Sequence, residues 1–148
     1  MTSKRRHWMY RRHSLTIVSA AILTLWIVLY LKSSPDTHIG AFFGNAIADW
    51  TGMVVTVVAT KYLYERGSAE SKRPRNILPK RWEEFLYEHS LTIFLVITGA
   101  MWVAAYVKMD ANGKWGQVVG NIVSEWTQVL GLVLLTKRLV ETGSKESK

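Results

Sequence analysis

Four long apolar blocks, separated by short polar stretches, run along the chain. Two of them, 14–31 and 90–107, contain no charged residue. As helices they would each be about 27 Å long, close to the thickness of a bilayer's hydrocarbon core. Two further blocks, about 39–64 and about 117–140, each contain a single acid. Because an isolated strand cannot satisfy its backbone in lipid, the pattern predicts an all-α polytopic membrane protein with four transmembrane helices.

The second half of the chain repeats the first at a constant offset of 76 residues. This register predicts two tandem two-helix repeats, 1–72 and 73–148, the second preceded by a linker. Because each repeat has an even number of spans, the two are expected to be parallel and related by a pseudo-two-fold axis along the membrane normal. The matching residues are His13-Ser14-Leu15-Thr16-Ile17 with His89-Ser90-Leu91-Thr92-Ile93, Trp26 with Trp102, Gly44-Asn45 with Gly120-Asn121, Asp49-Trp50-Thr51 with Glu125-Trp126-Thr127, and Gly67-Ser68 with Gly143-Ser144.

The formal net charge of +8 comes from basic residues that gather outside the apolar blocks. Residues 1–13, 61–89 and 137–148 hold 16 of the 19 Lys and Arg, and the opposite side holds only Lys32, Lys108 and Lys114. The positive-inside rule therefore predicts a multi-pass protein of the plasma membrane with both termini in the cytoplasm. Anionic lipid headgroups account for the basic excess, so no nucleic-acid partner is expected. A helical pattern over 82–89 predicts a short interfacial helix before the third span.

Asp49 and Glu125 are the residues most suggestive of chemistry. Each lies 12 residues before a basic residue, Lys61 or Lys137, which is about 18 Å along a helix and inside the hydrocarbon core. An ionised carboxylate there costs about 2.5–3.5 kcal/mol, so we expect both acids to point into the bundle. Polar residues at helical spacing form a stripe on each helix, expected to face each other: Asn45, Asp49, Thr56 and Thr60, and Asn121, Glu125, Gln128 and Thr136.

Such stripes suit protons or hard cations, which oxygen ligands prefer, and no basic residue accompanies them to attract anions. Two other interpretations stay open, namely structural polar packing and an interfacial location of the acids. Trp50 and Trp126, next to the acids, either gate access or fill space. His13 and His89 are either a pH-responsive pair or ordinary interfacial residues. Two Gly-x-x-x-Gly motifs predict close helix packing, with a functional kink as the alternative: Gly40 with Gly44, and Gly116 with Gly120.

Several functional classes are excluded. The absence of cysteine excludes disulfides, thiolate metal sites and thiol catalysis. No nucleophile elbow, zinc-protease motif or phosphate-binding loop occurs, so we expect no enzyme activity, cofactor or metal site. The loops within each repeat are too short for the pore helix and filter of a potassium channel. Two hypotheses remain: a homo-oligomeric channel or transporter subunit for cations or protons, and a non-transporting assembly or lipid-organising protein that binds partners through its glycine faces and basic segments.

The repeat endings Gly67-Ser68-Ala69-Glu70-Ser71-Lys72 and Gly143-Ser144-Lys145-Glu146-Ser147-Lys148 resemble an uncharacterised bacterial family. The acid-Trp element before Trp50 and Trp126 and the Ser-Leu starts at Ser14 and Ser90 are similar to it as well. Members of this family are small duplicated four-helix membrane proteins, known only as a domain of unknown function. The resemblance spans essentially the whole chain and implies the bacterial inner membrane. It implies no activity, and residues 51–53 lack the further acids that family members tend to have after the Trp.

Overall fold

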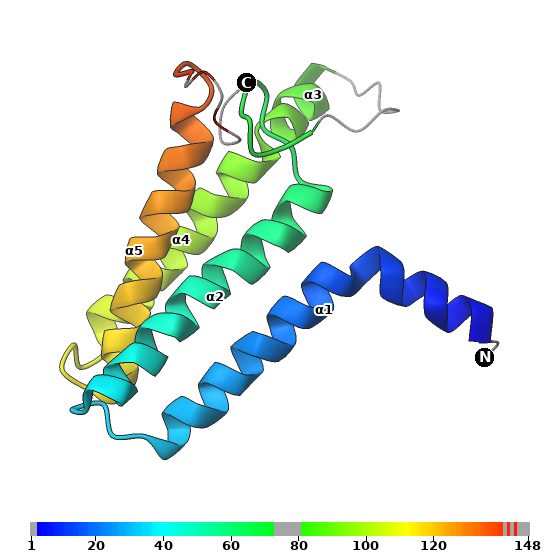
Figure 1. The fold of residues 1–148 in the computed structure, drawn as a ribbon. Coiled ribbons are helices and arrows are strands. Elements are labelled where there is room, and N and C mark those ends of the chain that lie inside the picture. Colours follow the sequence, from blue (N-terminus) through cyan, green and yellow to red (C-terminus); the bar gives the residue numbers. More distant parts are fainter. Residues whose placement is uncertain (1–2, 73–80, 141, 143, 145–148) are drawn as a thin grey trace.

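The computed structural model describes residues 3–72, 81–140, 142 and 144, and side chains within these ranges from His13 onward except at position 81. The predicted linker over 73–80 and most of the second repeat ending therefore lie outside the described residues. Over the described residues all regular secondary structure is helical (Figure 1). The helices are α1 (Ser3–Lys32), α2 (His38–Tyr62), α3 (Arg81–Glu88), α4 (Ser90–Lys108) and α5 (Lys114–Leu135).

Four of these helices are long and apolar enough to cross a membrane, which confirms the all-α prediction of four spans. The apolar part of α1 begins at His13, and α3 is the short helix expected before the third span. One boundary differs from the prediction, because α5 ends at Leu135 and not near Val140. There the amides of Lys137 and Arg138 bond to carbonyls three residues back, so the chain tightens into a turn.

The helices lie in the spatial order α1, α2, α5, α4. Extensive contacts among the described helices of the membrane-spanning part join only these neighbours, so α2 and α5 are central and α1 and α4 flank them (Figure 1). The central helices run in the same direction, and each forms an antiparallel pair with its outer neighbour. The result is an open array whose centre is accessible from one side. The tandem relation of the two pairs stays a prediction.

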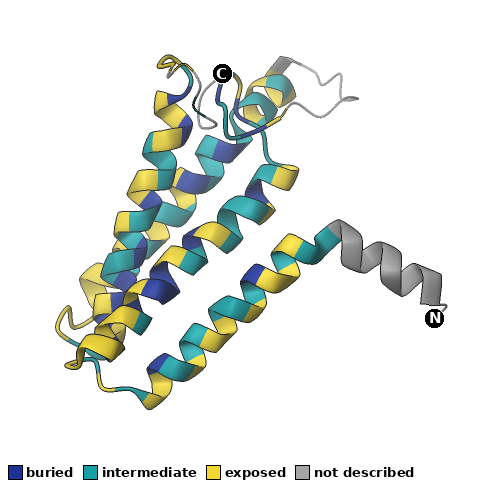
Figure 2. Ribbon diagram, in the orientation of Figure 1, coloured by how far each residue is buried: buried dark blue, intermediate teal, exposed yellow. Residues whose placement is uncertain are grey.

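The core lies along the two central helices (Figure 2). Its buried members come mainly from α2 and α5, with α1 and α4 each adding few. Most outward positions of α1 and α4 are apolar and exposed, as expected for helices surrounded by lipid. The buried core residues are Tyr30, Ile47, Ala48, Ala59, Leu91, Leu95, Val118, Ile122, Trp126 and Val133.

The four motif glycines have two different roles. A Cβ on Gly44 would lie 3.2 Å from the Tyr30 ring, and one on Gly120 would lie 3.0 Å from the Tyr106 ring. These two glycines therefore allow close helix packing inside each pair, as their spacing predicts. The other two glycines of the motifs differ from that prediction. A Cβ on Gly40 or Gly116 would lie only 1.8 or 1.9 Å from a carbonyl oxygen of the loop before its own helix, so both serve the loop turn.

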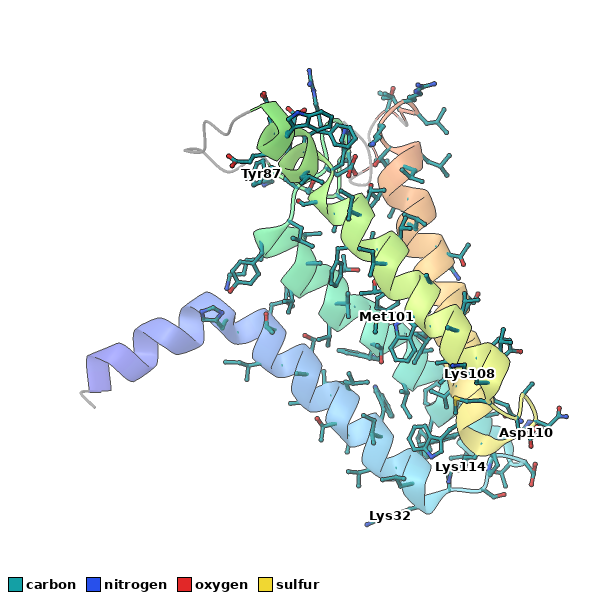
Figure 3. The ribbon with its side chains drawn as sticks, turned by 180° about the vertical axis from the view of Figure 1, so that it is seen from behind. Lys32, Tyr87, Met101, Lys108, Asp110 and Lys114 are labelled. Carbon is teal, nitrogen blue, oxygen red and sulfur yellow. The ribbon has the colours of Figure 1, made fainter. Side chains whose placement is uncertain are left out.

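The two ends of the molecule differ in chemistry. We call the end with the connections 33–37 and 109–113 the loop end, and the end where α4 begins and α2 and α5 end the basic end. Lys32, Lys108, Asp110 and Lys114 gather at the loop end, opposite Tyr87 (Figure 3). A residue of this end that the sequence analysis did not single out is Tyr30, which is 1% exposed. Its hydroxyl donates to the Lys114 carbonyl at 2.5 Å and joins α1 to the start of α5.

Candidate functional site

Polar side chains of α2 and α5 meet where the two central helices pack. We call Asn45, Asp49, Asn121, Glu125 and Gln128 the seam. The Asn121 amide nitrogen donates to the Asn45 side-chain oxygen at 2.5 Å. These two asparagines occupy matching positions, 76 residues apart, so the predicted facing of the two stripes holds here. The seam is thus a direct polar contact between the central helices.

The two acids of the seam lie at mid-span and close together. Each is eleven residues beyond the first residue of its helix, about 16 Å from that end. Their carboxyl groups are near enough to interact directly. Gly52 leaves room beside them, since a Cβ there would lie 3.7 Å from the Glu125 Cβ. The Gln128 side-chain nitrogen donates to a Glu125 carboxyl oxygen at 3.4 Å.

The seam is open on one side, which corrects the expectation that both acids are enclosed by the bundle. Asp49, Asn45 and Gln128 are exposed, and Glu125 and Asn121 are half-buried. The cause is the open helix order, which leaves one side of the α2–α5 contact uncovered within a single chain. Over the residues that the structure describes, neither Asp49 nor Glu125 forms an ion pair, and no cluster of three or more metal-ligating side chains occurs.

The three threonines of the predicted stripes do not continue the seam. Thr56 and Thr60 line a separate cavity of about 50 Å³, whose other walls come mainly from apolar residues of α4 and α5. The Thr60 hydroxyl donates to the Thr56 carbonyl at 2.6 Å, a bond within α2. Thr136 is 7% exposed and lies beyond the last residue of α5, where it bonds to Ser68. The expected continuous stripe is therefore limited to the seam.

The two tryptophans beside the acids differ from each other. Trp126 is 5% exposed and points into the α4–α5 contact. Its indole nitrogen donates to the Thr98 hydroxyl at 2.9 Å, and its ring meets Trp102 edge-on. A Cβ on Gly99 would lie 3.1 Å from it. Trp126 therefore fills space between two helices, the second of the expected roles, whereas Trp50 is only half-buried.

A second polar site lies at the basic end, and the sequence analysis missed it. Glu65, just after α2, is 0% exposed. Its carboxylate forms salt bridges with the Lys137 ammonium and, at 2.6 Å, with Nδ1 of His89. It also accepts the backbone N–H of Thr92 at 3.2 Å, in the first turn of α4. The positive end of the α4 dipole therefore adds to the two side-chain partners.

The environment of Glu65 keeps its carboxyl group charged. Burial by itself raises the pKa of Glu65. The bonds from Lys137, Thr92 and His89 outweigh that effect, and the pKa lies below its ordinary value of 4.5. The carboxylate therefore links the end of the first helix pair to both helices of the second.

The segment after Glu65 adds further bonds to the same two helices. Gly67, with a φ of 87°, takes the left-handed conformation that lets the chain turn back. Beyond it, Ser68 lies 3.1 Å from the Thr136 hydroxyl, and the amide of Ala69 donates to that hydroxyl. A signal for this site does exist in the sequence, because Glu65 and Glu141 stand 76 residues apart immediately before the two repeat endings.

Comparisons with known proteins add no relative. No protein-family model matches the chain, no curated protein matches it, and no solved structure matches it. The resemblance to an uncharacterised bacterial family therefore stays a prediction, and the functional argument rests on the seam and the basic end alone.

Proposed function

We propose that this protein conducts protons or small cations along the seam between α2 and α5. The observation that carries the proposal is the pair of neighbouring carboxyl groups, Asp49 and Glu125, at the middle of two apolar helices. Intramembrane acids are costly and are usually kept for ion or proton pathways. Their oxygen ligands suit a proton or a hard cation, and the seam has no basic side chain that would attract an anion.

The order of groups along the seam supports a pathway. The Asn45–Asn121 bridge lies one helical turn from the acids toward the loop end, and Gln128 lies about one turn toward the basic end. Two neighbouring carboxylates repel each other in a low dielectric, and one proton or cation held between them relieves that repulsion. The acids would bind the ion, and the amides would receive it on either side.

The proposed setting is the bacterial inner (plasma) membrane, with the basic end in the cytoplasm. Lys61 and Lys137 mark that end, and most basic residues of the chain lie with them outside the spans. The positive-inside rule assigns such an end, with both termini, to the cytoplasm. There the basic segments would meet anionic lipid headgroups.

The open side of the seam supports a homo-oligomer. An ionised carboxylate facing lipid at mid-span costs about 2.5–3.5 kcal/mol on insertion scales. A second copy placed over the exposed Asp49 and Asn45 would remove this contact with lipid. Four carboxyl groups, two from each copy, would then surround one path.

The alternative, a non-transporting assembly or lipid-organising protein, has less support. Its glycine faces would have to be free for partners, but Gly44 and Gly120 are already covered by Tyr30 and Tyr106 of the same chain. The basic segments remain as its support, because they suit anionic lipids in either case.

The test is ion flux into liposomes containing the purified protein. We expect an imposed pH gradient to collapse faster with wild type than with the double variant Asp49→Asn/Glu125→Gln, which keeps the side-chain shapes and removes both charges. Asp36→Asn is the matched control, because Asp36 is an exposed acid in the loop outside the spans. Replacing protons by a K⁺ or Na⁺ gradient identifies the ion. Equal flux for wild type and the double variant with every ion would reject the proposal.

A further inference from the structure

At the basic end, the segment that follows α2 is held by the ends of α4 and α5. We call residues 63–72 the first clasp. Its Glu65 carboxylate binds His89 and Lys137, and its Ser68 hydroxyl meets Thr136. Backbone atoms of Tyr64 exchange hydrogen bonds with Ser90 and the amide of Leu91. Figure 1 shows this segment, in green, folded over the end of the array at which α4 begins.

Every side chain that receives the first clasp recurs 76 residues earlier, on α1 and α2. The clasp side chains recur 76 residues later, at the C-terminus. The receiving residues His89, Ser90, Thr92, Thr136 and Lys137 correspond to His13, Ser14, Thr16, Thr60 and Lys61, and the clasp residues Glu65, Gly67, Ser68 and Ser71 correspond to Glu141, Gly143, Ser144 and Ser147.

The α1–α2 side already has the geometry of such a receiver. Lys61 Nζ lies 2.9 Å from Nδ1 of His13, so the counterparts of Lys137 and His89 are side by side. Both of these groups lie outside the helix interior, and Lys61 is exposed. A carboxylate placed against them would meet the same two nitrogen donors that hold Glu65.

Apolar residues at the two sites differ in exposure in the way that an uncovered site requires. Leu91, beneath the first clasp, is 1% exposed, whereas its counterpart Leu15 is 57% exposed. Leu63 of the first clasp is half-buried against the core, whereas its counterpart Leu139 is 60% exposed. Burying these two leucines against each other would remove apolar surface from the membrane boundary and from water.

We propose that residues 139–148 form a second clasp, which binds the α1–α2 side of the basic end in the same chain. The Glu141 carboxylate accepts from Lys61 and His13, and the Ser144 hydroxyl meets Thr60. The same chain supplies the segment because α5 packs directly on α2. The end of α5 is thus placed toward α2 as the end of α2 is placed toward α5. Each helix pair would then hold the other, and the two clasps would be reciprocal.

The differences between the clasps fall where the first clasp does not use the side chain. Val140 replaces Tyr64, whose contacts with Ser90 and Leu91 are made by backbone atoms. Thr142 replaces Arg66, whose side chain is 70% exposed. Lys145 replaces Ala69, which uses its backbone amide. The substitutions therefore keep the groups that bind.

The absence of cysteine makes disulfide trapping a direct test. The variant pair Thr60→Cys/Ser144→Cys probes the second clasp in the full-length protein in detergent or liposomes. Ser68→Cys/Thr136→Cys is the positive control, because these hydroxyls lie 3.1 Å apart. Thr37→Cys/Ser144→Cys is the negative control, because Thr37 caps the loop end of α2. We expect the test pair to oxidise within one chain at a rate near that of the positive control. That rate should exceed the negative control by at least roughly tenfold, because docking raises the effective concentration of the two thiols.

A charge exchange tests the recognition itself. Lys61→Glu should lower the crosslinking yield of the Thr60→Cys/Ser144→Cys pair, and adding Glu141→Lys should restore it. The positive-control pair reports correct folding in the same backgrounds. A test pair no faster than the negative control would overturn the proposal. So would a crosslink formed only between two chains, since that result would assign the segment to a neighbouring copy.

Discussion

The seam and the Glu65 site both place acids inside a membrane protein, but they treat the charge in opposite ways. Glu65 is fully buried and has three partners, one of them a backbone amide of α4. Asp49 is exposed on the open side of the array, and its nearest titratable neighbour is another acid. The first arrangement fixes two helix pairs together, whereas the second leaves an acid available to a mobile ion.

This contrast explains why the two sites are assigned different roles. A buried carboxylate with every oxygen occupied cannot exchange its partners without loss of structure. A carboxyl pair without an ion-pair partner keeps its unfavourable charge until a proton or cation arrives. The degree of pairing, more than the presence of an acid, therefore separates a structural site from a candidate pathway.

The largest effect expected concerns Glu65. Glu65→Gln removes the charge and leaves Lys137 and His89 beside an uncharged amide in a buried site. Breaking one partner of a buried ion pair costs about 3–5 kcal/mol, and the partial exposure of Lys137 and His89 favours the lower end of that range. We expect a large fall in the unfolding temperature in detergent micelles, measured by circular dichroism.

The matched control is Glu88→Gln, which removes an acid from the neighbouring ion pair with Arg66. Because the Arg66 side chain is 70% exposed, that pair is worth about 0–1 kcal/mol. Similar unfolding temperatures for Glu65→Gln and Glu88→Gln would mean that the Glu65 site does not hold the helix pairs together, and the contrast with the seam would be lost.

A smaller effect of the same site is expected on acidification. The pKa of Glu65 is lower in the folded protein than its ordinary value of 4.5. Its charge therefore contributes stability that is fully present above pH 4.5 and is lost as the pH falls through the lowered folded value. The measurement is the difference in unfolding temperature between wild type and Glu65→Gln from about pH 7 to about pH 3. We expect this difference to shrink only below pH 4.5, and a constant difference would contradict the linkage.

The sequence predicts the helices well because length, apolar content and charge placement are local properties. It predicts the facing of Asn45 and Asn121 because the 76-residue repeat puts the same residue at the same place on both central helices. It does not predict the open order α1, α2, α5, α4, because periodicity says which side of a helix is polar and not which helix covers it. The exposure of Asp49 follows from that order.

The remaining differences have similar causes. Helical spacing puts Thr136 on the stripe of Glu125, but α5 ends before Thr136 and its hydroxyl binds the first clasp. The spacing of Gly40 and Gly116 suggests a helix contact, but both lie in a first turn, where the preceding loop approaches them. Glu65 was missed because it stands outside the apolar blocks, where an acid is ordinarily solvated.

The smallest effect is expected for the amide bridge of the seam, and a double-mutant cycle measures it. Asn45→Ala and Asn121→Ala each remove one partner of a neutral hydrogen bond between α2 and α5. Such bonds between membrane helices average about 0.6 kcal/mol and reach about 1.7 kcal/mol, so the coupling free energy should fall in that range. It should therefore be several times smaller than the effect of Glu65→Gln. If the coupling instead matched the Glu65 effect, the seam would be as structural as the basic end. Its acids would then be better explained as packing groups than as an ion pathway.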